Sequence, residues 1–262
     1  YSDNPWFNLT LCALIVLGGI GFPVLYDLQC WIKVRNRQRC RLSIQTKTVL
    51  WTTLILIVLG ALMFALLEQL PARGDQPIWH RILTPVFQSI TCRTAGFNTV
   101  DIASLKGATL TMMIFLMFFG ASPGSCGGGV KTTTLAVLVA FTLSRIRRMR
   151  RVNLFKKSVP NDTISRSVSL VLVSIGIIAV VFFLILAGNT LDCPPLDNTK
   201  ETFIDYLFET VSAFGTVGLS MGVTPELNLW GKCWITAMMI VGRVGVLTFS
   251  YIIVGSGMQN GI

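Results

Sequence analysis

Long stretches without a single charged residue constrain this chain more than any other feature. Four such runs cover residues 4–26, 48–67, 107–130 and 167–191. Each reaches roughly the 20 residues that a helix needs to cross about 30 Å of hydrocarbon. Only 13% of the residues are charged, whereas soluble domains carry about 25%. These features predict an all-α polytopic membrane protein.

The basic residues cluster in alternate loops. Lysines and arginines fill residues 33–47 and 144–166, whereas residues 71–106 and 189–226 are mixed or acidic. Basic residues concentrate in the cytoplasmic loops of membrane proteins. We therefore expect a plasma-membrane protein with residues 33–47 and 144–166 in the cytoplasm. The N-terminus is then outside and the C-terminus cytoplasmic. The net charge of +10 has a source in these loops and does not indicate a nucleic-acid partner.

Five predicted spanning helices alternate with two shorter apolar segments. The spanning helices are expected at about residues 5–30, 47–70, 107–143, 166–190 and 227–256. The shorter segments, residues 78–91 and 202–214, are typical of re-entrant or buried helices because they are too short to cross. Each runs into a stretch of small residues, CRTAGFNT (92–99) or FGTVGLS (214–220), and then into another long helix.

The two small-residue stretches align with each other. Thr94 and Gly96 recur as Thr216 and Gly218, in both cases 122 residues later, and the same offset places Gly120 on Gly242. One residue of slippage occurs within the short helices. An offset shared by turn and helix predicts an internal repeat with corresponding geometry.

The short helices and their glycine turns suit a cation. A half-helix that enters from outside aims its partly negative C-terminal end at the membrane centre, and glycine lets successive carbonyls point to one side. Rings of such carbonyls can replace the hydration shell of potassium, and two turns would supply half of a four-part ring. Ordinary glycine turns at helix ends are the alternative. The predicted ion-binding residues are Thr94, Ala95, Gly96, Phe97, Asn98, Thr216, Val217, Gly218, Leu219 and Ser220.

A glycine-rich stretch interrupts the third long segment. Residues 107–144 carry one charge, Lys131, and would form a helix of about 57 Å, nearly twice the hydrocarbon thickness. Residues 120–129 hold five glycines and a proline, which are poor helix interiors, so we expect a break near mid-membrane that acts as a gate. The predicted gate residues are Gly120, Ala121, Ser122, Pro123, Gly124, Ser125, Cys126, Gly127, Gly128, Gly129, Lys131 and Arg243.

Two enzyme motifs compete for the same stretch. GSCGGGVKT nearly matches the phosphate-binding G-x-x-x-x-G-K-[ST] loop, but Val130 adds one residue and no strand precedes it. GASPG matches the G-x-S-x-G serine elbow and suggests an intramembrane serine hydrolase using Ser122 or Ser125. The single histidine, His80, is predicted at the outer mouth, so a serine–lysine dyad with Lys131 is the remaining form of that alternative.

Arg243 is the second anomaly in an apolar segment. It follows Lys232 by 11 residues, about 16 Å along a helix, and burial there costs at least roughly 2.5–3.5 kcal/mol. Its repeat partner is Ala121, at the start of the glycine break. We therefore expect Arg243 to face a water-filled path, bond loop carbonyls and repel cations. A structural arginine paired with a buried carbonyl is the alternative.

Four ordered motifs resemble the Trk/Ktr/HKT superfamily of potassium transporters, most closely the Ktr-type membrane subunit. They are RTAGFNT (93–99), GASPGSCGGGVKTTT (120–134), SAFGTVGLSMGVTP (212–225) and GRVGVLT (242–248). GGIGFPVLYDL (18–28) is similar to the helix that closes the family's second repeat. The resemblance implies tandem helix–pore-helix–helix repeats, as in potassium channels. It divides the chain into the end of a second repeat with its basic loop (1–46), a third repeat (47–160) and a fourth (161–262).

The resemblance also implies a function. It implies potassium uptake, often stimulated by sodium, through filter glycines at Gly96 and Gly218, with no covalently bound cofactor. The 120–131 loop would be an intramembrane gate opposed by Arg243. A homodimer on a cytoplasmic ring of nucleotide-binding subunits is expected, with the basic loops against that ring or against anionic membrane lipid. A Trk-type or HKT-type potassium/sodium transporter is the alternative within the superfamily.

Overall fold

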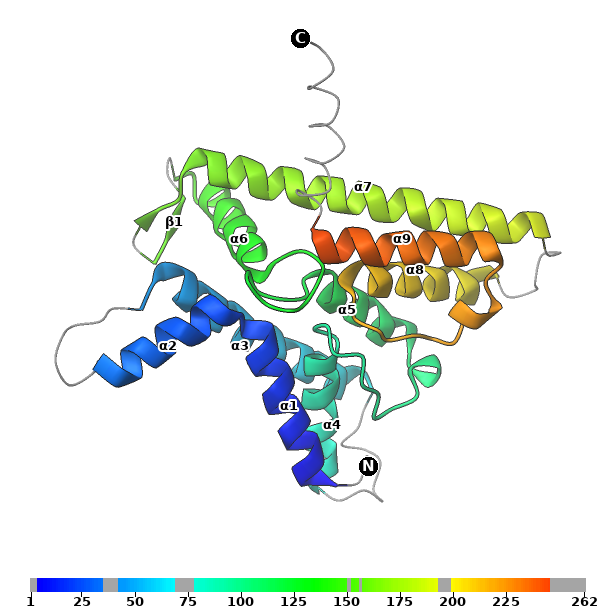
Figure 1. Ribbon diagram of the computed structural model, residues 1–262, viewed down its shortest axis with the longest axis horizontal. Coiled ribbons are helices and arrows are strands. Elements are labelled where there is room, and N and C mark those ends of the chain that lie inside the picture. The colour runs from blue at the N-terminus through cyan, green and yellow to red at the C-terminus, as the bar shows by residue number, and fades with distance from the viewer. Residues whose placement is uncertain are drawn as a thin grey trace, which may run out of the picture.

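The computed structural model describes residues 4–34, 42–68, 78–149, 152–155, 157–192 and 199–245, which are mainly helical (Figure 1). The helices are α1 (Pro5–Ile20), α2 (Phe22–Val34), α3 (Ile44–Leu67), α4 (Ile78–Thr91), α5 (Gly107–Phe118), α6 (Thr132–Ile146), α7 (Asn161–Asp192), α8 (Thr199–Gly215) and α9 (Leu229–Val244). Two 3-10 turns, η2 (Ile102–Ser104) and η3 (Thr224–Glu226), lie in the connections after α4 and α8. Strands β1 (Asn153–Leu154) and β2 (Lys157–Ser158) pair antiparallel within the basic segment before α7.

Two helices of the described chain, α3 and α7, are continuous, apolar and long enough to cross a membrane. The two shorter segments form helices as expected. α4 occupies residues 78–91, and α8 extends the predicted 202–214 segment to Thr199–Gly215. The sequence predicts a fifth spanning helix at residues 227–256. α9 accounts for its first part, and the portion beyond Gly245 lies outside the described residues.

The expected continuous helix at residues 5–30 is wrong, because the chain bends by 100° between α1 and α2. The bend lies at Gly21, whose φ of +92° is in the left-handed region that glycine adopts readily. A Cβ at this position would lie 2.5 Å from the carbonyl oxygen of Pro123. Close contact with a distant loop, together with Pro23 as the second residue of α2, therefore ends α1 where its apolar pattern continues.

The expected break in the third long segment is confirmed. α5 ends at Phe118 and α6 begins at Thr132, and the connecting loop contains the whole glycine-rich stretch. Figure 1 shows this loop folded into the middle of the molecule, beside the C-terminal end of α9. The segment thus forms two short helices joined by irregular backbone instead of one overlong helix.

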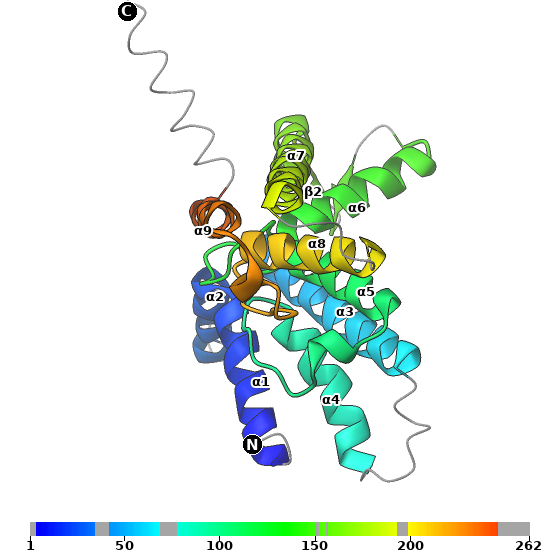
Figure 2. The same cartoon turned by 90° about the vertical axis from the view of Figure 1, so that its right-hand side faces the viewer.

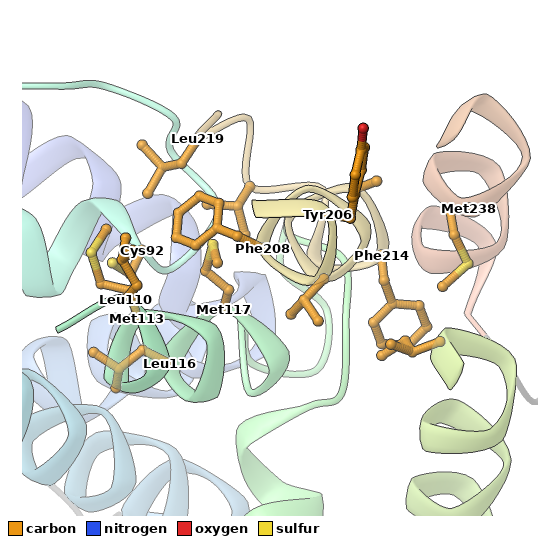
Figure 3. Packing of buried hydrophobic residues seen from close by; sticks show 14 of the residues in the cluster. Cys92, Leu110, Met113, Leu116, Met117, Tyr206, Phe208, Phe214, Leu219 and Met238 are labelled. Atoms are coloured by element: carbon orange, nitrogen blue, oxygen red, sulfur yellow. The ribbon is translucent and has the colours of Figure 1, made fainter. Parts of the chain in front are cut away.

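The largest hydrophobic core joins α5, α7, α8 and α9 (Figure 3). Met117 of α5 lies beside Phe208 of α8, whereas Phe214 of the same helix and Met238 of α9 lie at the far side of α8. These side chains are almost completely buried. The core holds the C-terminal end of α8, and the loop that follows it, within the bundle.

α4 is held in a separate set of contacts with α3 and α1 (Figure 2). Gly60 of α3 allows the close approach, since a Cβ there would lie 2.4 Å from the Ser89 hydroxyl oxygen. That hydroxyl donates to the carbonyl of Ile57 over 3.0 Å. On the other side of α4, Phe87 and Ile90 pack against α1. Both short helices are therefore buried in protein at their loop ends, where irregular backbone is tolerated in a membrane.

Candidate ion-binding site

The loops after α4 and α8 share an unusual backbone conformation. In the first loop (residues 94–98), Thr94 and Gly96 have φ angles of +73° and +74°. In the second loop (residues 216–220), Thr216 and Gly218 have φ angles of +50° and +87°. Positive φ is rare for a β-branched residue such as threonine. The internal repeat expected from the sequence therefore includes matching backbone geometry.

Each short helix also holds its loop through a hydroxyl group in its last turn. The Thr91 hydroxyl donates to the carbonyl of Phe97 over 2.7 Å and accepts from the Phe97 N–H over 3.0 Å. The Ser212 hydroxyl donates to the carbonyl of Leu219 over 2.6 Å. Thr91 and Ser212 are 121 residues apart and the loops 122, so the one-residue slippage falls within the short helices. These bonds orient one carbonyl of each loop.

The two loops meet at their glycines. A Cβ on Gly96 would lie 2.7 Å from the carbonyl oxygen of Val217 and 3.3 Å from the Cα of Gly218. Conversely, a Cβ on Gly218 would lie 3.5 Å from the Cα of Gly96. The side chains of Val217 and Leu219 are buried in the core, so the second loop presents mainly backbone to the first. The residues predicted to bind the ion therefore lie together, although 122 positions separate the loops.

The loop between α5 and α6, here called the glycine loop (residues 119–131), lies against the beginning of both other loops. A Cβ on Gly127 would lie 2.5 Å from the hydroxyl oxygen of Thr94, and one on Gly128 would lie 2.5 Å from that of Thr216. The Gly128 N–H donates to the Thr216 hydroxyl over 3.0 Å. Two neighbouring glycines thus contact the first residue of each predicted ion-binding loop, where a side chain would not fit.

Hydrogen bonds close the glycine loop at its base. The N–H of Val130 donates to the carbonyl of Phe118, and the N–H of Thr132 donates to that of Ala121, each over 3.1 Å. The hydroxyls of Ser122 and Thr132 lie 2.9 Å apart. The loop therefore leaves and returns at one place and has a defined conformation despite its five glycines.

The bend between α1 and α2 supports the glycine loop through two backbone hydrogen bonds. The N–H of Ser122 donates to the carbonyl of Gly19, and the N–H of Phe22 donates to that of Gly124, each over 3.1 Å. Both bonds use backbone groups on either side of Gly21, which an unbroken helix would have used internally. The bend and the loop therefore supply hydrogen-bond partners for each other's backbone N–H and C=O groups.

Two cationic side chains bond consecutive carbonyls of the glycine loop. The Lys131 ammonium donates to the carbonyl of Gly127 over 2.7 Å. The guanidinium of Arg243, from α9, donates to the carbonyl of Cys126, and its side chain is otherwise exposed. The structure places all the predicted gate residues in this loop or against it. Both interpretations of Arg243, as a pathway residue and as a structural one, include such a carbonyl contact.

The serine-hydrolase alternative lacks the contacts that it requires. The Ser122 hydroxyl is fully buried against Thr132, and the Ser125 hydroxyl donates to a backbone carbonyl. The Lys131 ammonium bonds a carbonyl of the loop, and the His80 ring bonds within α4. Among the residues that the structure describes, neither serine contacts the basic group that would activate it.

Arg93 is a site residue that the sequence did not single out. It is 6% exposed and precedes the first loop. Its Nε donates to the carbonyl of Gly120 over 3.2 Å, and a terminal nitrogen donates to the Thr53 hydroxyl over 3.3 Å. It thereby joins the first loop, the glycine loop and α3. Its position directly after an apolar helix is the sequence feature that could have indicated a role for Arg93. Sequence alone does not show which carbonyl its side chain bonds.

Comparisons with known proteins show the family to which the sequence is related. The TrkH family model, described as "Cation transport protein", matches residues 1–259. The chain is similar to "Ktr system potassium uptake protein B" of Bacillus subtilis (strain 168), with 36% identity over 253 residues, 96% of this chain and 54% of that protein. It is 32% identical to "Potassium/sodium uptake protein NtpJ" of Enterococcus hirae over 251 residues, 94% of this chain and 52% of that protein.

A solved structure shows the same fold. The potassium transporter TrkH from Vibrio parahaemolyticus superposes with a TM-score of 0.72 at 14% identity, and the match covers 95% of this chain and 52% of that one. The chain spans about half the length of the curated relatives reported above.

Proposed function

The chain belongs to the TrkH family of cation transport proteins, and from that premise we propose that it forms part of the ion-translocating subunit of a Ktr-type potassium-uptake system. Its relatives are named as transporters, and it is a multi-pass membrane transport protein, not an enzyme. In this proposal the chain supplies two segments of a selectivity filter and the gate beneath them.

One observation carries the proposal. Two loops with the same alternation of positive φ angles, at Thr94 and Gly96 and at Thr216 and Gly218, meet at their glycines. Alternating conformations of this kind turn successive carbonyls to one side, and carbonyl dipoles select potassium by replacing its water shell. Two such segments make half of a ring, so the remaining segments belong to the rest of the full-length subunit.

The glycine loop is the proposed gate. Gly127 and Gly128 contact the two threonines that begin the filter segments, so an ion leaving the filter meets this loop directly. Lys131 and Arg243 add two positive charges to it, and positive charge in a narrow pore raises the barrier for cations. A glycine-rich backbone has the conformational freedom to move aside.

The remaining parts of the proposal concern assembly and orientation. The Bacillus subtilis relative is named as protein B of a "Ktr system". A system of several components supports a regulatory partner for this chain. We propose a homodimer on a cytoplasmic ring of nucleotide-binding subunits. The basic loops at residues 33–47 and 144–166 would face the cytoplasm, against that ring or against anionic lipid. The N-terminus of this chain would then be outside the cell, and its C-terminus inside.

The first test is potassium uptake by the full-length parent protein, co-expressed with its regulatory subunit in a strain without uptake systems of its own. We expect the wild type to restore growth at low potassium and uptake of labelled rubidium or potassium. Sodium uptake without potassium uptake would instead favour an HKT-type transporter. No cation uptake, with the protein present in the membrane, would contradict the proposed function.

The gate is tested in the same strain with Arg243→Ala. This change removes a charge-assisted bond to the Cys126 carbonyl, so we expect the maximal uptake rate to change by about tenfold, upward if the bond holds the loop closed. Lys232→Ala is the matched control, because Lys232 lies on the same helix and bonds the carbonyl of Pro225 in the preceding loop. Equal rates for the wild type and both variants would make Arg243 a structural residue.

A further inference from the structure

A buried carboxylate holds the chain that leaves the second loop. Glu209 lies in α8 and is 5% exposed. Its Oε1 accepts from the Ser220 hydroxyl and, over 3.0 Å, from the Met221 N–H. Its Oε2 accepts from the Thr224 hydroxyl over 2.8 Å. One side chain therefore bonds three positions along the outward arm, defined here as residues 220–224.

The bonds of Glu209 extend through Ser220 to the rest of the arm. The Ser220 hydroxyl also accepts from the Gly222 N–H over 2.9 Å, and Gly222 has a φ of +92°. Ser220 is the last residue of the second loop, so the conformation of that loop's outer end depends on this network. Both oxygens of the carboxylate thus accept from protein donors, two at Oε1 and one at Oε2.

In the part of the chain that the structure describes, the residue that corresponds to Glu209 beside the first loop makes no such network. Gln88 corresponds to Glu209 by the 121-residue offset that also relates Thr91 to Ser212. The Gln88 side chain is 0% exposed, yet within the described residues neither its amide nitrogen nor its amide oxygen has a hydrogen-bond partner. The first loop is held by Thr91, whereas the second is held by Ser212 and by Glu209 as well. The two loops therefore have matching backbone conformations but differ in the side-chain hydrogen bonds that hold them.

A buried carboxylate is retained at low free-energy cost only where donors replace its hydration. Bonds to a charged acceptor are roughly twice as strong as neutral ones, so Glu209 fixes its three partners more firmly than hydroxyl contacts alone would. Removing it would leave the Ser220 and Thr224 hydroxyls and the Met221 N–H without their acceptor. The outer end of the second loop would then be free to change conformation.

We propose that Glu209 is a positioning residue that sets cation selectivity by fixing the outer end of the second loop through Ser220. This inference rests on the proposed filter function of the loop. It assigns selectivity to hydrogen-bond geometry, not to attraction between the carboxylate and the ion. A glutamine at this position retains an oxygen that accepts the two Oε1 bonds, and its amide N–H can donate to the Thr224 hydroxyl oxygen.

The experiment measures KM and maximal rate for potassium and for sodium in the full-length parent with its regulatory subunit. Glu209→Ala removes all three bonds, whereas Glu209→Gln removes the charge, retains an acceptor for the two Oε1 bonds and reverses the bond to Thr224. Glu68→Ala is the matched control. Glu68 is also an outer carboxylate that accepts bonds, from the Lys106 N–H and the Thr109 hydroxyl, but these belong to the start of α5 and not to the second loop.

We expect Glu209→Ala to change the ratio of potassium KM to sodium KM by about tenfold or more. Glu209→Gln should keep that ratio within about threefold of the wild type, and Glu68→Ala should leave it unchanged. If Glu209→Ala does not accumulate, the Ser220→Ala, Thr224→Val double variant takes its place. It removes the two hydroxyl partners of Glu209 and should also change the KM ratio.

Two outcomes would overturn the inference. One is an unchanged ratio in Glu209→Ala and in the double variant. The other is a glutamine variant as altered as the alanine variant, because charge and not geometry would then set selectivity. Absence of cation uptake by the wild type would instead contradict the proposed function itself. The two failures are therefore distinguished by the wild-type measurement.

Discussion

Thr94 and Thr216 adopt a conformation that threonine rarely takes. Their φ angles are +73° and +50°, and a non-glycine residue in this region costs about 1–3 kcal/mol. Each threonine begins one of the two loops, and its hydroxyl lies against Gly127 or Gly128 of the glycine loop. Strain at both repeated positions is therefore located where the proposed filter meets the proposed gate.

Gly96→Ser and Gly218→Ser test the loops at single positions. Both glycines have positive φ, and a Cβ on Gly96 would lie 2.7 Å from the Val217 carbonyl oxygen. We expect either change to lower the preference for potassium over sodium by about tenfold, because left-handed backbone costs an L-residue about 1–2 kcal/mol and the carbonyls must shift. The measurement is uptake of each cation by the full-length parent.

Gly176→Ser is the control for these substitutions. Gly176 lies inside α7, and no heavy atom of the described residues would come within 4 Å of an added Cβ. This variant should keep wild-type selectivity. If both loop variants are present in the membrane in normal amounts and keep wild-type selectivity, Gly96 and Gly218 do not take part in ion recognition.

At the scale of elements, hydrophobic length predicted most of the helices. The apolar runs located α3 and α7, and the short segments located α4 and α8. Five glycines in ten residues located the break between α5 and α6. These features depend on local composition, so a single sequence is sufficient to predict them.

The α1–α2 bend could not be predicted in this way, because it depends on contact with a loop about 100 residues away. A partial indication exists in hindsight: GGIG (18–21) and GRVG (242–245) both end a helix at a glycine, with φ of +92° at Gly21 and +91° at Gly245. The burial of Arg93 and of Glu209 was missed for a related reason, since sequence shows a charge but not the donors and acceptors that surround it.

Gly21→Ala tests the contact between the bend and the glycine loop. The change places a Cβ 2.5 Å from the Pro123 carbonyl oxygen and strains a φ of +92°. We expect it to reduce the free energy of unfolding by about 1–3 kcal/mol, measured by thermal or denaturant unfolding of the purified full-length parent. Gly18→Ala, three residues earlier and without a close neighbour in the described chain, should have no such effect. Equal stabilities of the two variants would show that the bend tolerates a side chain.

At the scale of the whole molecule, charge distribution predicts the orientation in the membrane. The basic segment that contains the β1–β2 hairpin should face the cytoplasm, and the connection from α4 to α5 should face outward. Cysteine labelling in an otherwise cysteine-free full-length parent checks this, because Ala103 of η2 and Ser158 of β2 are both exposed. We expect an impermeant thiol reagent to label Ala103→Cys from outside intact cells and Ser158→Cys only in inverted vesicles. The reverse pattern would contradict the orientation.

The contact of Gly127 and Gly128 with both threonines has a thermodynamic consequence for the intact transporter. Moving the glycine loop removes the N–H that Thr216 accepts, so each filter segment has different neighbours in the two positions of the loop. Coupling free energies are reciprocal. If displacement of the loop weakens cation binding by some factor, the bound cation must favour the undisplaced loop by the same factor. The transported ion would then be an effector of its own gate, and the external cation concentration would contribute to how often the pathway opens.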